Sequence, residues 1–147
     1  MSSICLFGDS ISKGVVLDTI RGRYKLLKNS FANLFSSNTG VSVENYSKFG
    51  CTVTKGKELI DNHLSKISNF VFTVLEFGGN DCDFDWTAIS KFPDQDHSPK
   101  TELDEFESSY SEIIDNVISA GSLPVLLTLP PLDAKRYYSW ISKGRNS

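Results

Sequence analysis

The sequence predicts a protein of the α/β class, in which helices cover both faces of a parallel sheet. Two observations support this prediction. Short apolar runs alternate along the chain with longer segments of helical periodicity, and polar turns follow the apolar runs. The chain has 147 residues, a common size for one domain with a single core. We therefore expect one domain that spans residues 1–147.

Four segments are predicted as the strands of this sheet. They are Ile4–Phe7, a segment that begins at Val41, and the runs Phe70–Leu75 and Leu123–Leu129. Continuous apolar runs of this length are typical of parallel strands, because helices bury both of their faces. The last run stops at Pro130, which cannot donate a backbone hydrogen bond to a neighbouring strand.

Three segments with apolar residues three or four positions apart are predicted as helices. The first runs from Tyr24 to Phe35 and ends near Gly40, the second lies at Lys57–Lys66, and the third runs from Leu103 to Val117. Glycine follows the first and third segments, as is common where helices end. A polar loop over Cys82–Thr101 precedes the third helix.

Polar turns follow the first three strands. Ser10 comes after the first strand, Gly50 after the second and Asn80 after the third. The carboxyl ends of parallel strands are where ligands bind in such sheets, so these turns should converge on one rim. A serine at a strand exit can act as a nucleophile if a base takes its proton and donors stabilise the oxyanion. Gly-Asp-Ser by itself is a weak signal, because most such triplets are simply turns.

The three turn sequences in combination resemble the signature blocks of the SGNH (GDSL-type) serine ester hydrolases. The blocks Gly8–Ser10, Asn45–Gly50 and Gly78–Asp81 occur in the family's order and in its strand context. Ile11 replaces the leucine of the family's GDSL motif, which is a conservative change. The resemblance implies a three-layer α/β/α fold with a flavodoxin-like parallel sheet.

The resemblance also implies roles for individual residues. Ser10 would be the nucleophile that forms an acyl intermediate. The oxyanion hole would consist of the backbone N–H groups of Ser10 and Gly50 and the side-chain amide of Asn80. We expect Asp9 and Asp81 to support the site by accepting backbone hydrogen bonds that orient the loops.

The catalytic base presents a difficulty. The family's base is a histidine in an Asp-x-x-His motif that follows a fifth strand, whereas this chain has only His63 and His97. Asp94–His97 matches the motif literally, but it lies before the predicted third helix and fourth strand. We therefore treat His97 as a weak candidate for the base. We expect His63 to be a partly exposed residue of the second helix.

The sequence stops soon after the fourth strand, so we expect the fifth strand and the last helix of the family fold to be missing. The chain could be a truncated piece, an interrupted reading frame or one part of a cleaved protein. A fourth strand without a neighbour would expose an unpaired edge. We expect association through that edge, either with the missing piece or with a second copy of the chain.

Composition excludes several other classes of function. The net charge is −3 and the pI about 5.3, which disfavours nucleic acid as a partner. No apolar run approaches the ~20 residues that cross a membrane, and the first residues do not form a signal peptide. The three cysteines have no paired spacing, which is typical of reduced thiols. We expect a cytoplasmic protein that needs no cofactor or metal.

Two functional interpretations remain open. The first is an SGNH-type hydrolase of small carboxylic esters, in the lipase, esterase and acetyl esterase class, that is inactive in the form of this chain alone. The alternative is a non-catalytic fragment or pseudoenzyme that binds a small ligand at the same rim. The loop aromatic residues could line an acyl or sugar pocket, or could simply pack the surface; they are Trp86, Tyr137 and Tyr138, together with Arg136.

Overall fold

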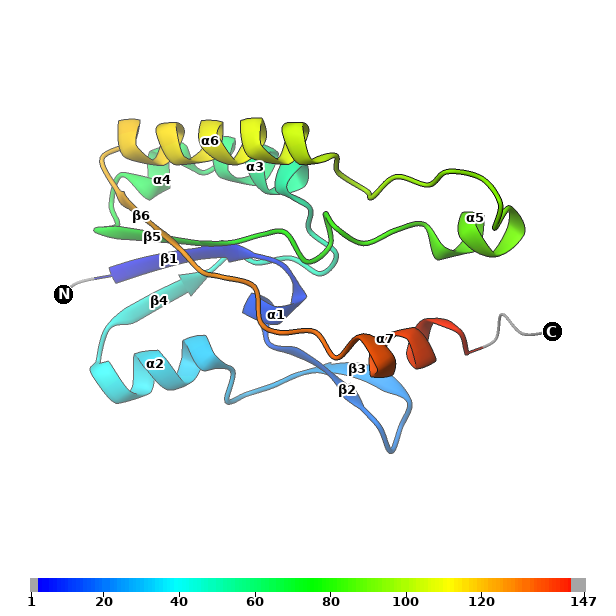
Figure 1. Cartoon of the computed structure of the whole chain (residues 1–147). Helices are drawn as coiled ribbons and strands as arrows, with labels where there is room; N and C mark the ends of the chain where they lie inside the picture. The colour runs from blue at the N-terminus through cyan, green and yellow to red at the C-terminus, as the bar shows by residue number, and fades with distance from the viewer. Residues whose placement is uncertain (1–2, 144–147) are drawn as a thin grey trace.

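A four-stranded parallel sheet forms the centre of the computed structural model, which describes residues 3–143 (Figure 1). Positions 1–2 and 144–147 of the expected domain lie outside the described residues. The strand order is β4-β1-β5-β6, and each neighbouring pair is parallel. The strands are β1 (Ser3–Gly8), β4 (Ser42–Asn45), β5 (Phe72–Glu76) and β6 (Leu123–Leu126). The predicted α/β class and parallel sheet are confirmed, and the described part of this sheet has four strands.

Helices lie on both faces of the sheet (Figure 1). One face carries α3 (Val53–Asp61), α4 (Leu64–Ile67) and α6 (Leu103–Ser119), and the other carries α2 (Phe31–Thr39). Three further helices lie toward the carboxyl ends of the strands: α1 (Ser10–Lys13), α5 (Trp86–Lys91) and α7 (Ala134–Ile141). None of the described helices is both long and apolar enough to span a membrane.

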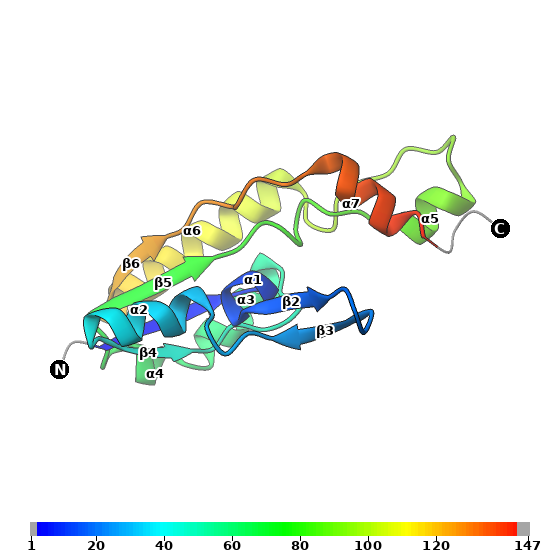
Figure 2. The same ribbon diagram turned by 90° about the horizontal axis from the view of Figure 1, so that it is seen from below.

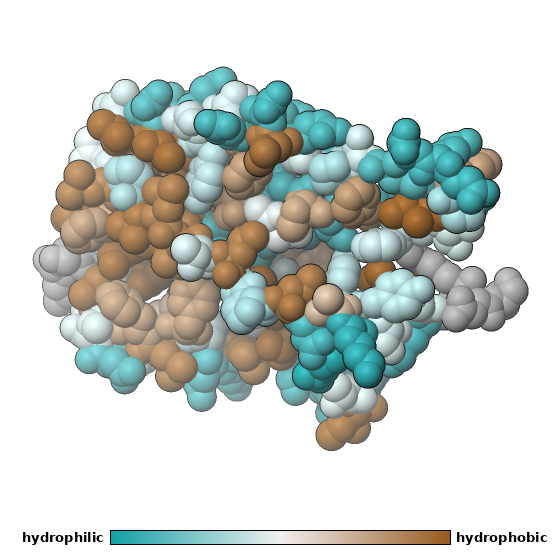
Figure 3. All heavy atoms as spheres, viewed as in Figure 1, coloured by the Kyte–Doolittle hydropathy of each residue, from teal (hydrophilic) through white to brown (hydrophobic). Residues whose placement is uncertain are grey.

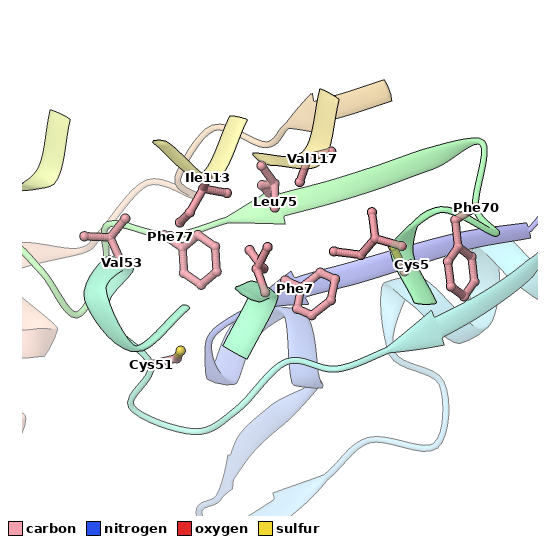
Figure 4. Close-up of a cluster of buried hydrophobic side chains, with 11 residues drawn as sticks. Cys5, Phe7, Cys51, Val53, Phe70, Leu75, Phe77, Ile113 and Val117 are labelled. Atoms are coloured by element: carbon pink, nitrogen blue, oxygen red, sulfur yellow. The ribbon is translucent and has the colours of Figure 1, made fainter. Parts of the chain in front are cut away.

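The hydrophobic core lies between the sheet and α3, α4 and α6 (Figure 4). Phe7 and Leu75 are register partners on β1 and β5, so their side chains lie on the same face of the sheet. Ile113 and Val117 are four residues apart on α6 and therefore point to the same side of that helix. All four side chains are fully buried in one cluster. The periodicity that predicted the third helix thus corresponds to its buried face.

The prediction of a helix beginning at Tyr24 was wrong. Residues 15–26 form an antiparallel hairpin of β2 (Val15–Asp18) and β3 (Arg23–Leu26), and α2 begins only at Phe31 (Figure 2). The Asp18 carboxylate accepts the backbone N–H groups of Ile20 and Arg21, which closes the hairpin turn. Tyr24 packs its ring against Phe49 instead of continuing a helical face.

The predicted helix at Lys57–Lys66 is two helices. It begins earlier, at Val53, and breaks between Asp61 and Leu64, so that α3 and α4 are separate. His63 lies at this break and not in mid-helix; it is partly exposed and its ring packs against Tyr46. The end of α2 next to Gly40 agrees with the sequence, because Gly40 adopts a positive φ of 70° there.

Candidate active site at the carboxyl ends of the strands

The turn after β1 presents Ser10 at the first position of α1. The buried carboxylate of Asp9 caps this helix by accepting the Ile11 N–H at 2.8 Å. Gly8 has little space, because a Cβ there would lie 2.8 Å from both the Glu76 carbonyl oxygen and Ser12 Oγ. The close passage of β1 past β5 therefore requires glycine immediately before the Asp9–Ser10 turn.

The loop after β4 is hydrogen-bonded to the Ser10 turn. Asn45 Nδ2 donates to the backbone oxygen of Ser12 at 2.7 Å, and its Oδ1 accepts the Ser47 N–H at 3.0 Å. The Lys48 N–H donates to the Gly8 carbonyl at 3.0 Å. Gly50 then adopts a φ of +67°, a conformation that favours glycine. The sequence Asn45–Gly50 thus builds a loop that is tied to α1.

The side chain of Asn80 links these two turns. Its Nδ2 donates to Asp9 Oδ2 at 3.1 Å and to the Cys51 carbonyl oxygen at 3.2 Å. Asp9 is the residue before Ser10, and Cys51 is the residue after Gly50. The three polar turns therefore meet at one rim, at the same end of the sheet. The oxyanion-hole roles of Ser10, Gly50 and Asn80 stay a prediction.

The second aspartate, Asp81, organises the loops on the other side of Asn80. It is buried, and its Oδ1 accepts both the Val53 N–H at 2.9 Å and the Thr101 hydroxyl at 2.7 Å. These bonds join the turn after β5 to the start of α3 and to the end of the loop before α6. Asp81 thus holds three segments of the rim together, and one of its hydrogen bonds comes from a backbone N–H group, that of Val53.

Neither histidine is hydrogen-bonded to Ser10 within the described residues. His97 Nε2 bonds with the Phe92 carbonyl at 2.8 Å, and His63 Nδ1 bonds with the Leu59 carbonyl at 2.7 Å. The connection from α5 to α6, which carries His97, lies away from α1 in both ribbon views (Figures 1 and 2). The interpretation of His97 as a weak candidate for the base stays a prediction.

Glu76 is a rim residue that the sequence reading did not single out. It ends β5, is only 2% exposed, and accepts the Ser12 hydroxyl at 2.8 Å through Oε2. Burial raises the pKa of Glu76 to about 7, although the hydrogen bond from Ser12 opposes the rise. The signal was available in the sequence, because a charged residue lies between the apolar residues Leu75 and Phe77.

Two of the loop aromatic residues, Trp86 and Tyr137, contact Asp83, whereas Tyr138 is exposed. Asp83 Oδ1 accepts the Trp86 indole N–H at 2.8 Å and the Tyr137 hydroxyl at 2.6 Å, and its Oδ2 pairs with Lys100 at 2.9 Å. Arg136 lines a separate cavity beside the β2–β3 hairpin. These contacts explain the packing of Trp86 and Tyr137 without a ligand.

A mainly apolar cavity of about 660 Å³ borders the turn that carries Asn80. Its walls come from the ends of β5 and β6, the Cys82–Thr101 loop and α6; they include Phe77, Gly78, Phe106, Tyr110 and Leu129. Among the described residues, no group of three or more His, Cys, Asp or Glu side chains is arranged to hold a metal ion.

Known structures resemble this chain over nearly its whole length. A lipase/acylhydrolase from Enterococcus faecalis is 21% identical, with a TM-score of 0.65 over 99% of this chain and 73% of that one. The esterase EstA from Pseudoalteromonas sp. is 16% identical, with a TM-score of 0.58 over 99% and 74%. A member of the lipolytic protein G-D-S-L family from Veillonella parvula is 19% identical, with a TM-score of 0.54 over 86% and 57%.

The chain has the fold of the SGNH hydrolases. The predicted resemblance is thus confirmed at the level of the fold, and the chain spans about three quarters of the length of several structures that share it. No family model matches the sequence, and no curated protein matches it. In this SGNH fold the Ser10 turn and the Asn80 turn lie at adjacent strands, β1 and β5.

Proposed function

We propose that this chain carries the nucleophile and the oxyanion hole of an SGNH-type hydrolase of carboxylic esters. The observation that supports this most is the position of the Asn80 amide, bonded both to Asp9, beside Ser10, and to the Cys51 carbonyl, beside Gly50. One side chain thereby brings together the three residues that the sequence resemblance selects. The likeness in fold to esterases and lipases supports the same class of reaction.

In the proposed reaction, Ser10 Oγ attacks the ester carbonyl carbon and the alcohol leaves from a tetrahedral intermediate. The negative oxygen of that intermediate would accept hydrogen bonds from the N–H groups of Ser10 and Gly50 and from Asn80 Nδ2. Asp9 and the Cys51 carbonyl accept both N–H groups of this amide, so one of these two hydrogen bonds must be exchanged for the oxyanion when the charge develops. Water would then release the acid from the acyl-Ser10 intermediate.

A general base must take the Ser10 proton, and this requirement governs the activity of the chain. Each histidine already bonds one ring nitrogen to a backbone carbonyl. A general base typically raises the rate by roughly 10²–10⁴-fold. Because neither histidine is hydrogen-bonded to Ser10 in the described part of the chain, we propose that the 147-residue chain alone is nearly inactive. The same arrangement is compatible with the alternative, a non-catalytic protein that binds a small ligand at this rim.

We propose a small ester, such as an acetylated sugar, as the substrate, with the apolar cavity beside Gly78 receiving the acyl group. We also propose that the protein acts in the cytoplasm. The thiols support this location, since Cys5, Cys51 and Cys82 are all free.

The deciding assay is turnover of p-nitrophenyl acetate by the chain 1–147 beside a chain extended through the downstream coding sequence. We expect activity only from the extended chain, and we expect Ser10→Ala to abolish it. Asn80→Ala should lower turnover by roughly 10²–10³-fold. Asn69→Ala, which removes an exposed asparagine, is the matched control and should change nothing. An extended chain without activity would favour the binding protein.

The same assay tests His97. If its match to the Asp-x-x-His pattern is coincidental, His97→Ala leaves the rate of the extended chain nearly unchanged. Equal, Ser10-dependent rates from the short and extended chains would instead show that the base is already present, and His97 would become the leading candidate.

A further inference from the structure

Two buried carboxyl groups lie side by side beneath the Ser10 turn. Asp9 and Glu76 are each only 2% exposed, and Gly8 is the register partner of Glu76 across the sheet. Glu76 Oε2 accepts the Ser12 hydroxyl at 2.8 Å and the Asp9 N–H at 3.5 Å. The proposed mechanism gives Glu76 no role, although it contacts both ends of the turn that presents Ser10.

The hydrogen bonds around the pair differ for the two residues. Asp9 Oδ1 accepts the Ile11 N–H at 2.8 Å, and Asp9 Oδ2 accepts Asn80 Nδ2 at 3.1 Å. Both oxygens of Asp9 therefore face hydrogen-bond donors. By contrast, the buried Glu76 Oε1 has no hydrogen-bond partner among the described residues.

The charges around Glu76 favour its neutral form. The Asp9 N–H donates to Glu76 Oε2 at 3.5 Å, so the two buried acidic residues are neighbours, and adjacent buried carboxylates repel each other. The Tyr110 hydroxyl of α6 donates to the neighbouring Leu75 carbonyl at 3.4 Å, and burial, together with the Glu76 charge, raises the pKa of Tyr110 to about 12. None of the ion pairs of the described residues supplies a cation to Asp9 or Glu76.

We propose that Glu76 is a positioning residue, whose protonated carboxyl group donates to Asp9 and thereby holds Asp9 against Asn80. Glu76 acts through Asp9 and Asn80, since it touches neither the reacting atoms nor the bound ester. Loss of its proton places a second negative charge beside Asp9, which disturbs both the cap of α1 and the acceptor of the Asn80 amide. The effect of Glu76 on catalysis rests on the proposed function, whereas the hydrogen bond from protonated Glu76 to Asp9 does not depend on it.

The pH range follows from the direction of the pKa shift. Burial raises the pKa of Glu76 to about 7 from its ordinary value of 4.5. A proton that the folded chain binds more tightly stabilises the fold fully below the unfolded pKa, and this stabilisation is lost as pH rises through the folded value. The arrangement of Asn80 should therefore change near pH 7.

The test uses carboxyl ¹³C and side-chain amide ¹⁵N NMR on the chain 1–147, where no enzyme activity is needed. We expect Glu76 to titrate near pH 7 and the Asn80 amide signals to shift with the same midpoint. Glu76→Gln keeps a neutral hydrogen-bonding side chain, so the variant should fold and its Asn80 signals should no longer shift near that pH. The exposed Glu107→Gln is the matched control and should retain the wild-type titration.

Titration of Glu76 in the ordinary glutamate range, or Asn80 signals that shift equally in Glu76→Gln, would overturn the proposal. In an active extended chain, Glu76→Gln should also alter the dependence of the rate on pH near 7, where a histidine base would titrate in both proteins. Failure of the extended chain to hydrolyse esters would count against the proposed function but leave the NMR result for the carboxyl pair intact.

Discussion

The two faces of the sheet carry similar apolar side chains but differ in what covers them. On one face, Phe7 and Leu75 are fully buried under α3 and α6 (Figure 4). On the other, α2 stands beside an open apolar cavity of about 400 Å³, and Figure 3 shows hydrophobic side chains gathered at this surface. This cavity is lined by Ile4, Leu6, Phe31, Ala32, Phe35, Val43, Phe72, Val74, Val125 and Leu127.

The difference shows that the burial of an apolar residue depends on what packs against it and not on the residue type alone. Val125 on β6 is as apolar as Val117 on α6, yet it is 37% exposed whereas Val117 is fully buried. The covered face should therefore supply most of the stability of the chain. The open face should supply less stability and more tendency to associate.

The largest expected effect comes from the covered face. Ile113→Ala should lower the free energy of unfolding by about 2–5 kcal/mol, because it leaves a cavity in the core. Ile118→Ala, on the same helix but 55% exposed, is the matched control, with an expected change within about 0.5 kcal/mol. Urea unfolding measures both. Equal losses from the two variants would mean that the two sides of α6 do not differ in packing.

Adding an atom to the covered face should lower the free energy of unfolding by somewhat less than Ile113→Ala does. A Cβ on Gly56 of α3 would lie 2.4 Å from the ring of Phe77, so the ring must move. Gly56→Ala should destabilise the chain by about 1–3 kcal/mol, although alanine is the better helix former. Ser65→Ala, at an exposed position of α4, should be nearly neutral in the same thermal unfolding experiment. A more stable Gly56→Ala variant would show that this interface is loosely packed.

Association through the exposed edge of the fourth strand remains our proposal for the open side. The N–H groups of Leu123 and Leu127 donate to the carbonyls of Val71, just before β5, and Leu75 of β5. The backbone at Pro124 and Leu126 therefore faces outward in this parallel ladder. Pro124 lacks an N–H, which weakens this edge for strand pairing and leaves the apolar face as the main contact.

Val125→Lys should weaken self-association by about tenfold, or ~1.4 kcal/mol, since it places a charge on the apolar face. Sedimentation velocity over a concentration series measures the effect. Val71→Lys is the control, because Val71 is exposed but does not line the open cavity. A chain that stays monomeric at every concentration would contradict this proposal.

The smallest expected effect concerns α2, the helix on the open face. Ser30 caps it through a bond from the Asn33 N–H to Ser30 Oγ that is long, at 3.4 Å. Ser30→Ala should cost about 0.5–1 kcal/mol, near the low end for such caps. Ser37→Ala, exposed within the same helix, is the control. A loss as large as that of Ile113→Ala would show that α2 contributes as much as the covered face.

The sequence alone determined the layers of this protein and the three polar turns that meet at its rim. Apolar runs specify buried strands wherever helices cover them, and the parallel order then brings the turns at Ser10, Gly50 and Asn80 to one end of the sheet. Those turns are local features, since Gly50 needs a positive φ and Asp9 caps the helix that follows it. Local chemistry of this kind can be read from neighbouring residues.

The tertiary structure decided what depends on contacts between distant segments. Tyr24 fits a helical period, but the Asp18 turn and the contact with Phe49 place it in a hairpin. Glu76 looks like the polar end of a strand, yet β1 and α1 enclose it beside Asp9. Helical spacing and residue type are local, whereas burial and the pKa shift that follows from it depend on segments far apart in sequence.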